Sequence, residues 1–289
     1  MRKFVLVANS TTDESGAYYE QNDIRCAALS FTMEGRTVHE DFGKTIPFPT
    51  FYDNLRAGKL SQTSQATMEE YQEHFRAACR AGLDVLYVGF SSGLSGSFQA
   101  GCIAAAEVRE EFPDRVIRCV DSLSAAGGEG ILVERARQLR DAGYTADEAG
   151  DAIEELRLKV IHLVTVDDLK HLWRGGRVSK SAAVVGSLIG IKPMIYVDDA
   201  GKLQVCGKVR GRKKALDKLV ETTLAQIAER EIPVRISHGD CEADARYVAD
   251  KLQAAGLSTE IRMLDTVLGS HTGPGVMTTF FIGTARGPF

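Results

Sequence analysis

The fold can be worked outward from Asp84-Val-Leu-Tyr-Val-Gly-Phe90 and from Ser91-Ser-Gly-Leu-Ser-Gly-Ser97, which follows it directly. The first stretch is a short apolar run typical of a buried strand, and a helical pattern over 98–112 follows the second. Glycines let such a turn approach a ligand closely, and Ser95 or Ser97 would stand at a helix N-terminus, which attracts anions. The sequence therefore predicts a strand–turn–helix unit whose turn is either a plain capped turn or an anion site.

The rest of the first half repeats this alternation of strand and helix. Apolar runs at 4–8 and 116–121 predict further strands, and helical patterns begin at 68, 128 and 146. Thr67 with Glu70 and Thr145 with Glu148 have the spacing of capping boxes that open two of these helices. Strands joined through helices imply crossover connections, so we expect a parallel sheet. The polar stretch 9–13 after the first strand would either line a crevice or cap the next helix.

The second half has a different pattern. Strands are predicted at 160–166, 192–197, 202–209, 234–238, 258–263 and 277–282, and helices at 167–173, 212–230 and 240–255. Asp198-Asp-Ala-Gly201 is a hairpin signal, which favours a partly antiparallel sheet. We therefore predict an α/β fold with an N-terminal parallel-sheet α/β domain (1–158), a C-terminal α+β domain with a mixed sheet (159–289), and the ligand between them. Residues 34–60 have weak periodicity and are expected to be irregular.

Composition narrows the functional class. The 289 residues are 44% hydrophobic and 26% charged with a formal net charge of −4, which is normal for a globular protein and argues against broad nucleic-acid binding. No apolar stretch is long enough to cross a bilayer, and the N-terminal run is too short for a signal peptide. The six cysteines form no CxxC pair, so free thiols of a cytoplasmic protein are expected, with no structural metal site.

Four further stretches carry candidate functional residues. Arg174 and Arg177 surround a Gly-Gly bend, and arginine suits carboxylate or phosphate binding, although surface ion pairing is the usual alternative. His271 lies between Ser270 and Thr272 in the glycine-rich stretch 269–275, where we expect a loop that carries the histidine toward an anion; a purely structural loop histidine is the alternative. Thr63-Ser64-Gln65 gains meaning only if it meets the 91–97 turn. The basic run 208–214 would either dock an acidic partner or form a solvated helix start.

In their joint order, several short motifs resemble the DegV family, the fatty-acid-binding subunits of bacterial fatty acid kinase. They are Thr63-Ser64-Gln65, Ser92-Gly93-Leu94-Ser95-Gly96, Asp121-Ser122, Gly175-Gly176-Arg177, Ile191-Lys192-Pro193 and His271-Thr272-Gly273-Pro274-Gly275. Family members often carry Thr-Asp-Ser after the first strand, whereas this chain has Ala8-Asn9-Ser10.

The resemblance implies one long-chain fatty acid held between two domains, with no cofactor, no metal and no catalytic residue of the chain's own. A separate kinase subunit would phosphorylate the carboxylate with ATP, and the acyl-phosphate would pass to acyltransferases of phospholipid synthesis. Carried over by position, Thr63, Ser95 and His271 would bind the carboxylate. Secondary candidates are Ser92, Gly96, Ser97, Arg174, Arg177, Ser270 and Thr272.

The needs of a buried acyl tail and of a buried carboxylate agree with this assignment. An acyl tail gains about 0.8 kcal/mol for each buried methylene, and a buried carboxylate needs hydrogen-bond donors. Neutral hydroxyls and an imidazole would satisfy the carboxylate and still leave it open to phosphorylation, so we expect the arginines to lie further out. Two other classes remain open: a serine hydrolase using Ser95 and His271 with Asp121, and a phosphate- or nucleotide-binding protein using the 91–97 turn.

Overall fold

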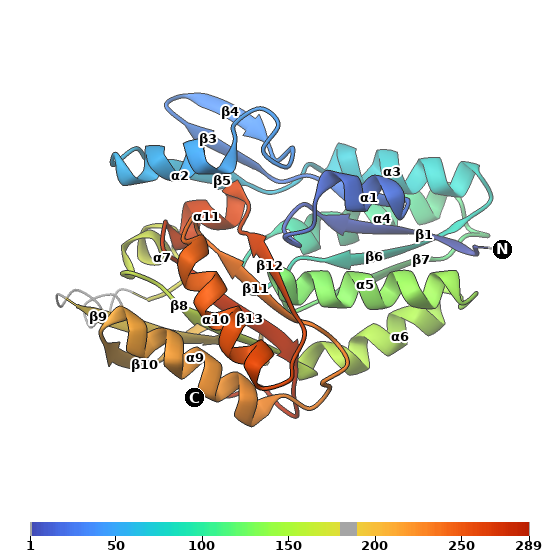
Figure 1. The fold of residues 1–289 in the computed structure, drawn as a ribbon. Coiled ribbons are helices and arrows are strands. Elements are labelled where there is room, and N and C mark those ends of the chain that lie inside the picture. The colour runs from blue at the N-terminus through green and yellow to red at the C-terminus, as the bar shows by residue number, and fades with distance from the viewer. Residues whose placement is uncertain (1, 180–189, 289) are drawn as a thin grey trace.

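The N-terminal part is built on a parallel sheet. The computed structural model describes residues 2–179 and 190–288. The sheet has the order β2 (Ile24–Ala27), β1 (Phe4–Asn9), β6 (Asp84–Gly89) and β7 (Ile117–Asp121), and all its neighbours pair in parallel. Helices α3 (Met68–Arg80) and α4 (Ser97–Glu111) cover one face, and α5 (Gly127–Asp141) and α6 (Ala146–Leu156) cover the other, as Figure 1 shows. The predicted parallel sheet is confirmed.

The C-terminal part contains a six-stranded mixed sheet. Its order is β10 (Leu203–Arg210), β9 (Ile191–Val197), β8 (Val160–Thr165), β13 (Met277–Ile282), β11 (Val234–His238) and β12 (Thr259–Met263). Only β11 and β12 pair in parallel. Helices α9 (Arg212–Gln226) and α10 (Glu242–Ala254) pack on one face, while the other face joins α5 in one large core. The mixed sheet and the β9–β10 hairpin are confirmed; α9 ends at Gln226 rather than at 230. The domain boundary at 158/159 stays a prediction.

The expectation of an irregular segment at 34–60 is wrong. Strands β3 (Ser30–Met33), β4 (Arg36–His39) and β5 (Ser61–Ser64) form a small antiparallel sheet, and α2 (Phe48–Arg56) packs beside it. The strands are too short to show a clear alternation, and α2 begins without a side-chain cap. Their shared aromatic cluster of Phe31, Phe51 and Tyr52 is a tertiary feature that local periodicity does not reveal.

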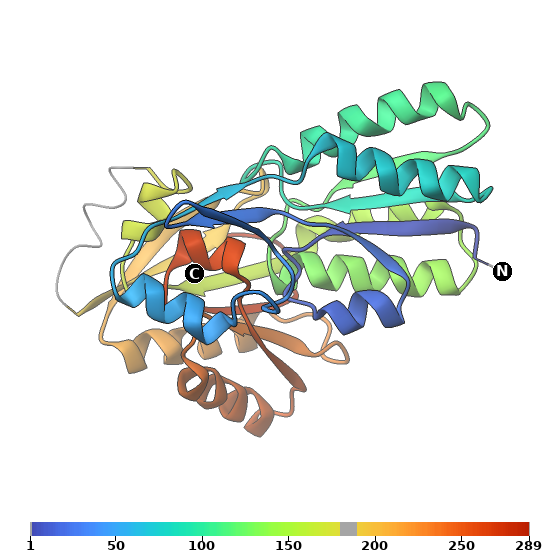
Figure 2. The same cartoon turned by 90° about the horizontal axis from the view of Figure 1, so that it is seen from above.

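The glycine-rich stretch at 269–275 is also not the predicted loop, because most of it belongs to helix α11 (Thr266–Thr272). The Asp265 carboxylate caps this helix by accepting from the N–H of Leu268 at 2.8 Å. Within this helix Gly269 leaves room for Tyr52, whose hydroxyl oxygen would be 2.7 Å from a Cβ atom there. Helix α11 packs against α2, β3 and β5, which lie over it in both Figure 1 and Figure 2.

The predicted caps and first residues of the helices can be compared with the structure. Thr145 and Glu148 form the predicted capping box of α6. At α3, Thr67 does accept from the N–H of Glu70, but the Glu70 carboxylate accepts from the N–H of Ala28 at 2.8 Å instead of closing the box. The short helix α1 (Gly16–Gln21) is capped by Ser15 and not by a residue of 9–13, and α7 (Lys170–Arg174) starts later than predicted.

No helix within 2–179 or 190–288 has the length and apolar character needed to span a membrane. Cys79 is buried, and the other five cysteines are half-buried. Within the same described ranges, no group of three or more His, Cys, Asp or Glu side chains has the arrangement of a metal site.

Candidate functional site

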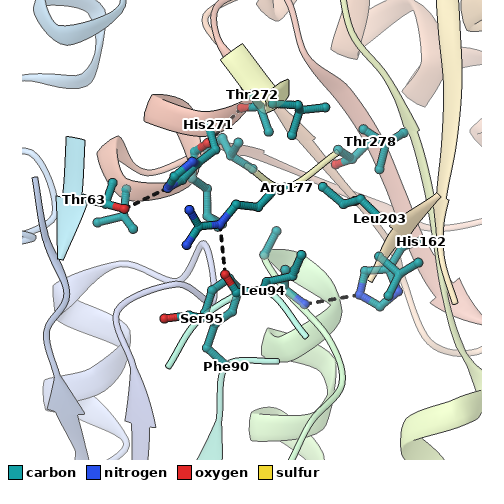
Figure 3. A pocket seen from close by; sticks show the side chains of 18 of the residues that line it. Thr63, Phe90, Leu94, Ser95, His162, Arg177, Leu203, His271, Thr272 and Thr278 are labelled. Atoms are coloured by element: carbon teal, nitrogen blue, oxygen red, sulfur yellow. Dashed lines mark hydrogen bonds between the residues drawn. The ribbon is translucent and has the colours of Figure 1, made fainter. Parts of the chain in front are cut away.

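A mostly apolar cavity lies between the two halves of the chain, with about 750 Å³ of unfilled space that includes its opening to solvent (Figure 3). Its wall comes from the β6–α4 turn, the start of α5, the inner faces of β8 and β13, and α11. Most of the lining is apolar, contributed by Leu29, Phe90, Leu94, Ala125, Ala126, Val164, Leu172, Val197, Leu203, Leu264, Val267, Leu268 and Phe280. Such a chamber suits a long apolar ligand.

One end of the cavity is polar. Thr63 from β5, Ser95 from the β6–α4 turn, Arg177 from the segment after α7, and His271 and Thr272 from α11 all line it. The hydroxyl of Thr63 lies 2.8 Å from Nε2 of His271. The fold therefore brings the three principal sequence candidates, Thr63, Ser95 and His271, to one cavity from remote segments.

His271 is held as a neutral imidazole. Burial first, and then the positive charge of Arg177, lower its pKa to about 4. Its Nδ1 atom is buried with no hydrogen-bond partner within residues 2–179 and 190–288. Gly175 packs against this atom so closely that a Cβ there would lie 2.1 Å from it. The Gly-Gly bend thus makes room for the imidazole, which carries no charge and bonds to Thr63 through Nε2.

Arg177 lines the cavity itself, so the expectation that both arginines lie further out is wrong for this residue. Its Nε donates to the carbonyl of Leu94 at 3.0 Å, and Nη1 donates to the carbonyl of Gly175. It has no ion pair with any carboxylate in the described parts of the chain, and burial lowers its pKa. Arg174 is exposed and is not part of the cavity wall. Arg177 is therefore a partly buried cation that lines the cavity and has no carboxylate partner within residues 2–179 and 190–288.

Ser95 lies where α4 begins. Its hydroxyl accepts from the N–H of Ser97 at 3.2 Å and lies 3.1 Å from the Ser97 hydroxyl. Ser97 is the first residue of α4 and is fully buried. A Cβ on Gly96 would be 2.4 Å from the Gln65 side-chain oxygen, so the Thr63-Ser64-Gln65 motif does meet the 91–97 turn.

The backbone of the 91–97 turn is occupied by internal contacts. Ser91 accepts from the N–H groups of Gly93, Leu94 and Ser95, and the N–H of Ser92 donates to Asp121. A phosphate-cradling loop needs free N–H groups, so this geometry does not favour the phosphate-binding alternative. Ser92 and Gly96 line a separate groove rather than the cavity.

The two secondary candidates on α11 have different positions. The Ser270 hydroxyl donates to the Thr266 carbonyl at 2.6 Å and lies 2.7 Å from the Ser61 hydroxyl, away from the cavity wall. Thr272 does line the cavity, with its hydroxyl donating to the Leu268 carbonyl at 3.0 Å. Ser270 therefore fixes α11 on the small sheet, whereas Thr272 borders the ligand space.

A family model described as "Uncharacterised protein, DegV family" matches residues 3–284. The chain belongs to the DegV family. A DegV domain-containing protein of Clostridium perfringens is 36% identical over the full length of both chains. Among solved structures, a DegV-family protein of Thermus thermophilus described by its fatty acid binding has a TM-score of 0.87 at 28% identity, covering 98% of this chain and 100% of that one. A fatty-acid-binding DegV protein of Streptococcus agalactiae has a TM-score of 0.86 at 27% identity over 98% and 100%.

Asn9, which departs from the DegV pattern, has a structural role in this chain. Its amide group donates to the carbonyl of Ala27 and to the hydroxyl of Tyr71, and its oxygen accepts from Tyr87 and from the N–H of Phe90. A carboxylate could not make the two donations. Asn9 is fully buried and does not border the cavity, so it holds strand ends together.

The contacts of this DegV chain do not form a serine-hydrolase relay. His271 bonds to Thr63 rather than to Ser95, and its Nδ1 has no carboxylate partner in the described residues. Asp121 instead accepts from the backbone N–H groups of Ser92 and Leu123. A catalytic triad needs the nucleophile, the imidazole and the carboxylate bonded in series.

Sequence reasoning set His162 aside because its spacing fits no metal motif, yet it lines the cavity far from Thr63 (Figure 3). The signal was available in the two-residue alternation of its strand. Val160, His162 and Val164 share one face of β8, and all three belong to or border the core between the two halves.

A cluster of buried carboxyl groups lies beneath α11 and ties it to the N-terminal part. Its members, here called the carboxyl cluster, are Asp13, Glu40, Glu129 and Asp265. Asp13 accepts from the Ser237 hydroxyl at 2.5 Å, and Glu40 accepts from the N–H of Thr266 at 3.1 Å. One oxygen each of Asp13, Glu129 and Asp265 is buried without a partner in the described residues. Glu14, the neighbour of Asp13 in the chain, pairs instead with Arg235 at 2.8 Å.

Burial raises the pKa of Asp13 to about 7, and burial also raises the pKa values of Glu40, Glu129 and Asp265. The folded protein therefore keeps protons that the unfolded chain releases. Their contribution to the free energy of unfolding is complete below about pH 4 and is lost as the pH rises through about 7. We expect the free energy of unfolding, measured with urea, to fall between about pH 5 and about pH 8. Asp13→Asn, a neutral mimic, should flatten that slope; an equal slope in the variant would contradict the assignment.

Proposed function

We propose that this protein binds a long-chain fatty acid, with the tail in the apolar cavity and the carboxylate at Thr63, Ser95, His271 and Arg177. The observation that carries the proposal is Arg177, a partly buried cation that faces the polar end of an apolar chamber with no carboxylate partner in the described residues. A fatty acid supplies both missing parts, an anion and an apolar tail. The related proteins of Thermus thermophilus and Streptococcus agalactiae, described as binding fatty acids, support the same ligand class.

The contacts of Arg177 leave the carboxylate open to further chemistry. A side-on bidentate pair with a carboxylate uses Nε together with Nη2, and Nε already donates to the Leu94 carbonyl. The remaining donors at this end, Thr63 and Ser95, are neutral hydroxyls. Since Nη1 already donates to the Gly175 carbonyl, we infer that Arg177 binds one carboxylate oxygen through Nη2 and that the other oxygen stays free as a nucleophile toward a phosphoryl donor.

We infer from this that the protein is a cytoplasmic carrier rather than a complete enzyme. It presents the bound acid to an ATP-dependent kinase subunit, which forms the acyl-phosphate, and an acyltransferase of phospholipid synthesis then accepts the acyl group. The family resemblance supports this role. The chain's own residues bind and orient the acid, and the kinase supplies the phosphoryl transfer.

The carboxylate site is tested by replacing Thr63 and Ser95 together with alanine. Each hydroxyl bonded to a charged group contributes about 1.5–3 kcal/mol, so we expect the double variant to lose at least about tenfold in fatty-acid affinity while its fold is retained. Native mass spectrometry of protein purified from bacteria measures the fraction that carries a fatty-acid mass.

Ser64→Ala with Ser92→Ala is the matched control, because both serines are exposed and neither lines the cavity. The control should keep the lipid occupancy of the wild type. Full occupancy in the Thr63/Ser95 variant would refute the site, and the absence of any fatty acid from the wild type would refute the ligand class.

The basic run 208–214 is our candidate for the kinase-docking surface. Within this run, Arg212 forms an ion pair with Asp244, with its Nε 2.7 Å from Oδ2. The other four cations are exposed, and none forms an ion pair within the parts of the chain that the structure describes: Lys208, Arg210, Lys213 and Lys214. An uncompensated positive patch would attract an acidic partner surface.

Reversing these four charges to glutamate should slow acyl-phosphate formation by about tenfold or more at low salt, because electrostatic steering speeds association. Hydroxylamine trapping of the acyl-phosphate measures the rate, and lipid occupancy should not change. The matched control reverses four other exposed cations, Lys3, Arg36, Lys44 and Arg80. Equal rates in both variants would remove the patch from the docking surface.

A further inference from the structure

His162 closes the cavity at the end away from the carboxylate site. Figure 3 places it on the opposite side of the cavity from Thr63 and His271. Val164 lies two residues beyond His162 on the same face of β8, roughly 6.6 Å from it along the strand. Strand β8 then leads toward α7 and Arg177. A ligand bound by its head at Arg177 therefore passes Val164 before its tail reaches His162.

The His162 ring is held rigidly in this position. Its Nδ1 lies 3.2 Å from the Val160 carbonyl, and its Nε2 accepts from the N–H of Ala125 at 3.4 Å. The ring packs edge-on against Phe280, with centroids 5.3 Å apart and an interplanar angle of 86°. The backbone of α5 lies directly behind it, since a Cβ on Gly128 would be 2.2 Å from Nε2.

An aliphatic side chain at this place could change rotamer and yield to a longer tail. The imidazole has hydrogen bonds on both ring nitrogens and backbone behind it, so it has little freedom to withdraw. Burial, reinforced by the charge of Arg286, holds the pKa of His162 well below its usual value, so the ring presents a neutral edge to the tail.

We propose that His162 is a specificity-determining residue that sets the maximum length of the acyl chain. The proposal rests on the proposed fatty-acid function and extends it to the choice among fatty acids. Each methylene buried before the stop raises affinity about fourfold, whereas a methylene beyond the stop has no apolar space to enter. Affinity should therefore rise with chain length to a turning point and then fall.

The test measures dissociation constants for a series of saturated acids from laurate to behenate. In His162→Ala we expect the turning point to move to acids longer by about two methylene groups, which become about tenfold or more tighter than in the wild type. Val164→Ala is the matched control, because it widens the same strand face nearer to the head without lengthening the cavity. Its turning point should equal that of the wild type.

Ala125→Leu tests the same end in the opposite direction and leaves His162 in place. Ala125 lines the cavity beside the imidazole, so the added side chain should move the turning point to shorter acids. This variant decides the matter if His162→Ala does not fold. An unchanged turning point in the folded variants would overturn the role of His162 while leaving fatty-acid binding intact. A wild type that binds no acid of the series would instead refute the proposed function.

Discussion

Replacing Arg177 with methionine is expected to lower the affinity for a long-chain fatty acid by about 100-fold. A hydrogen bond to a charged group contributes about 1.5–3 kcal/mol, and without Arg177 the ligand carboxylate would be buried with no cation. Burial, the larger cause of the lowered pKa of His271, persists in the variant, so we expect the imidazole to stay neutral and not to replace the lost charge. Isothermal titration with palmitate measures the effect.

A fatty alcohol of the same chain length separates electrostatics from structure. Arg177 also donates to the carbonyls of Leu94 and Gly175, so its loss could disturb the cavity wall. If Arg177 acts on the carboxylate, the methionine variant should bind the alcohol about as well as the wild type does, and Arg177→Lys should recover part of the affinity for the acid. An equal loss for the acid and the alcohol would show that Arg177 only supports the wall.

The second large effect is expected on stability, at Arg286. Its guanidinium donates to five acceptors at 2.7–3.0 Å: the carbonyls of Leu123, Arg157, Val160 and Asp198, and the Ser124 hydroxyl. These groups belong to the β7–α5 connection, the end of α6, the start of β8 and the β9–β10 turn. One side chain near the C-terminus thereby ties both sheets together. Arg286→Ala should lower the free energy of unfolding by about 3–5 kcal/mol.

Urea unfolding of Arg286→Ala measures this loss. Arg286→Lys keeps the charge but has fewer donors, so we expect an intermediate stability. Arg246→Ala serves as the surface control. Arg246 forms an exposed pair with Glu242, and its replacement should change stability by less than about 1 kcal/mol. If Arg286→Ala lost no more stability than Arg246→Ala, Arg286 would not be tying the two sheets together.

The central strands of the fold could be predicted from the sequence because burial on both faces gives them continuous apolar runs. Residues 84–90 and 160–166 show this, and their strands run Asp84–Gly89 and Val160–Thr165. The β9–β10 hairpin could be predicted because its turn has a strong local signal. These features depend on interactions between near neighbours, which the sequence displays directly.

The small sheet and helix α11 could not be predicted in the same way, because their stability comes from each other. Gly269 lies inside the helix at a position where Tyr52 occupies the space of a side chain. Glycines normally disfavour helix, so the local pattern at 269–275 indicated a loop. The contact partner is more than 200 residues away in sequence, and no local rule contains it.

The candidate site also contains residues that could be predicted from the sequence and residues that could not. The ordered motifs of the DegV family pointed to Thr63, Ser95 and His271, and the structure places all three at one cavity. The position of Arg177 within the wall depends on how the segment after α7 meets the 91–97 turn at the Leu94 carbonyl. The alternation along β8 could have placed His162 on the cavity face, but the sequence does not show how far along the cavity it lies.

A crystal structure with an ω-bromo fatty acid tests the central claim most directly, because the density locates the carboxylate and the anomalous signal of bromine locates the far end of the tail. Our account predicts the carboxylate within hydrogen-bond distance of Thr63 and Arg177, and the bromine beside His162 and Phe280. Bromine beside Thr63, or a ligand bound outside this cavity, would contradict it.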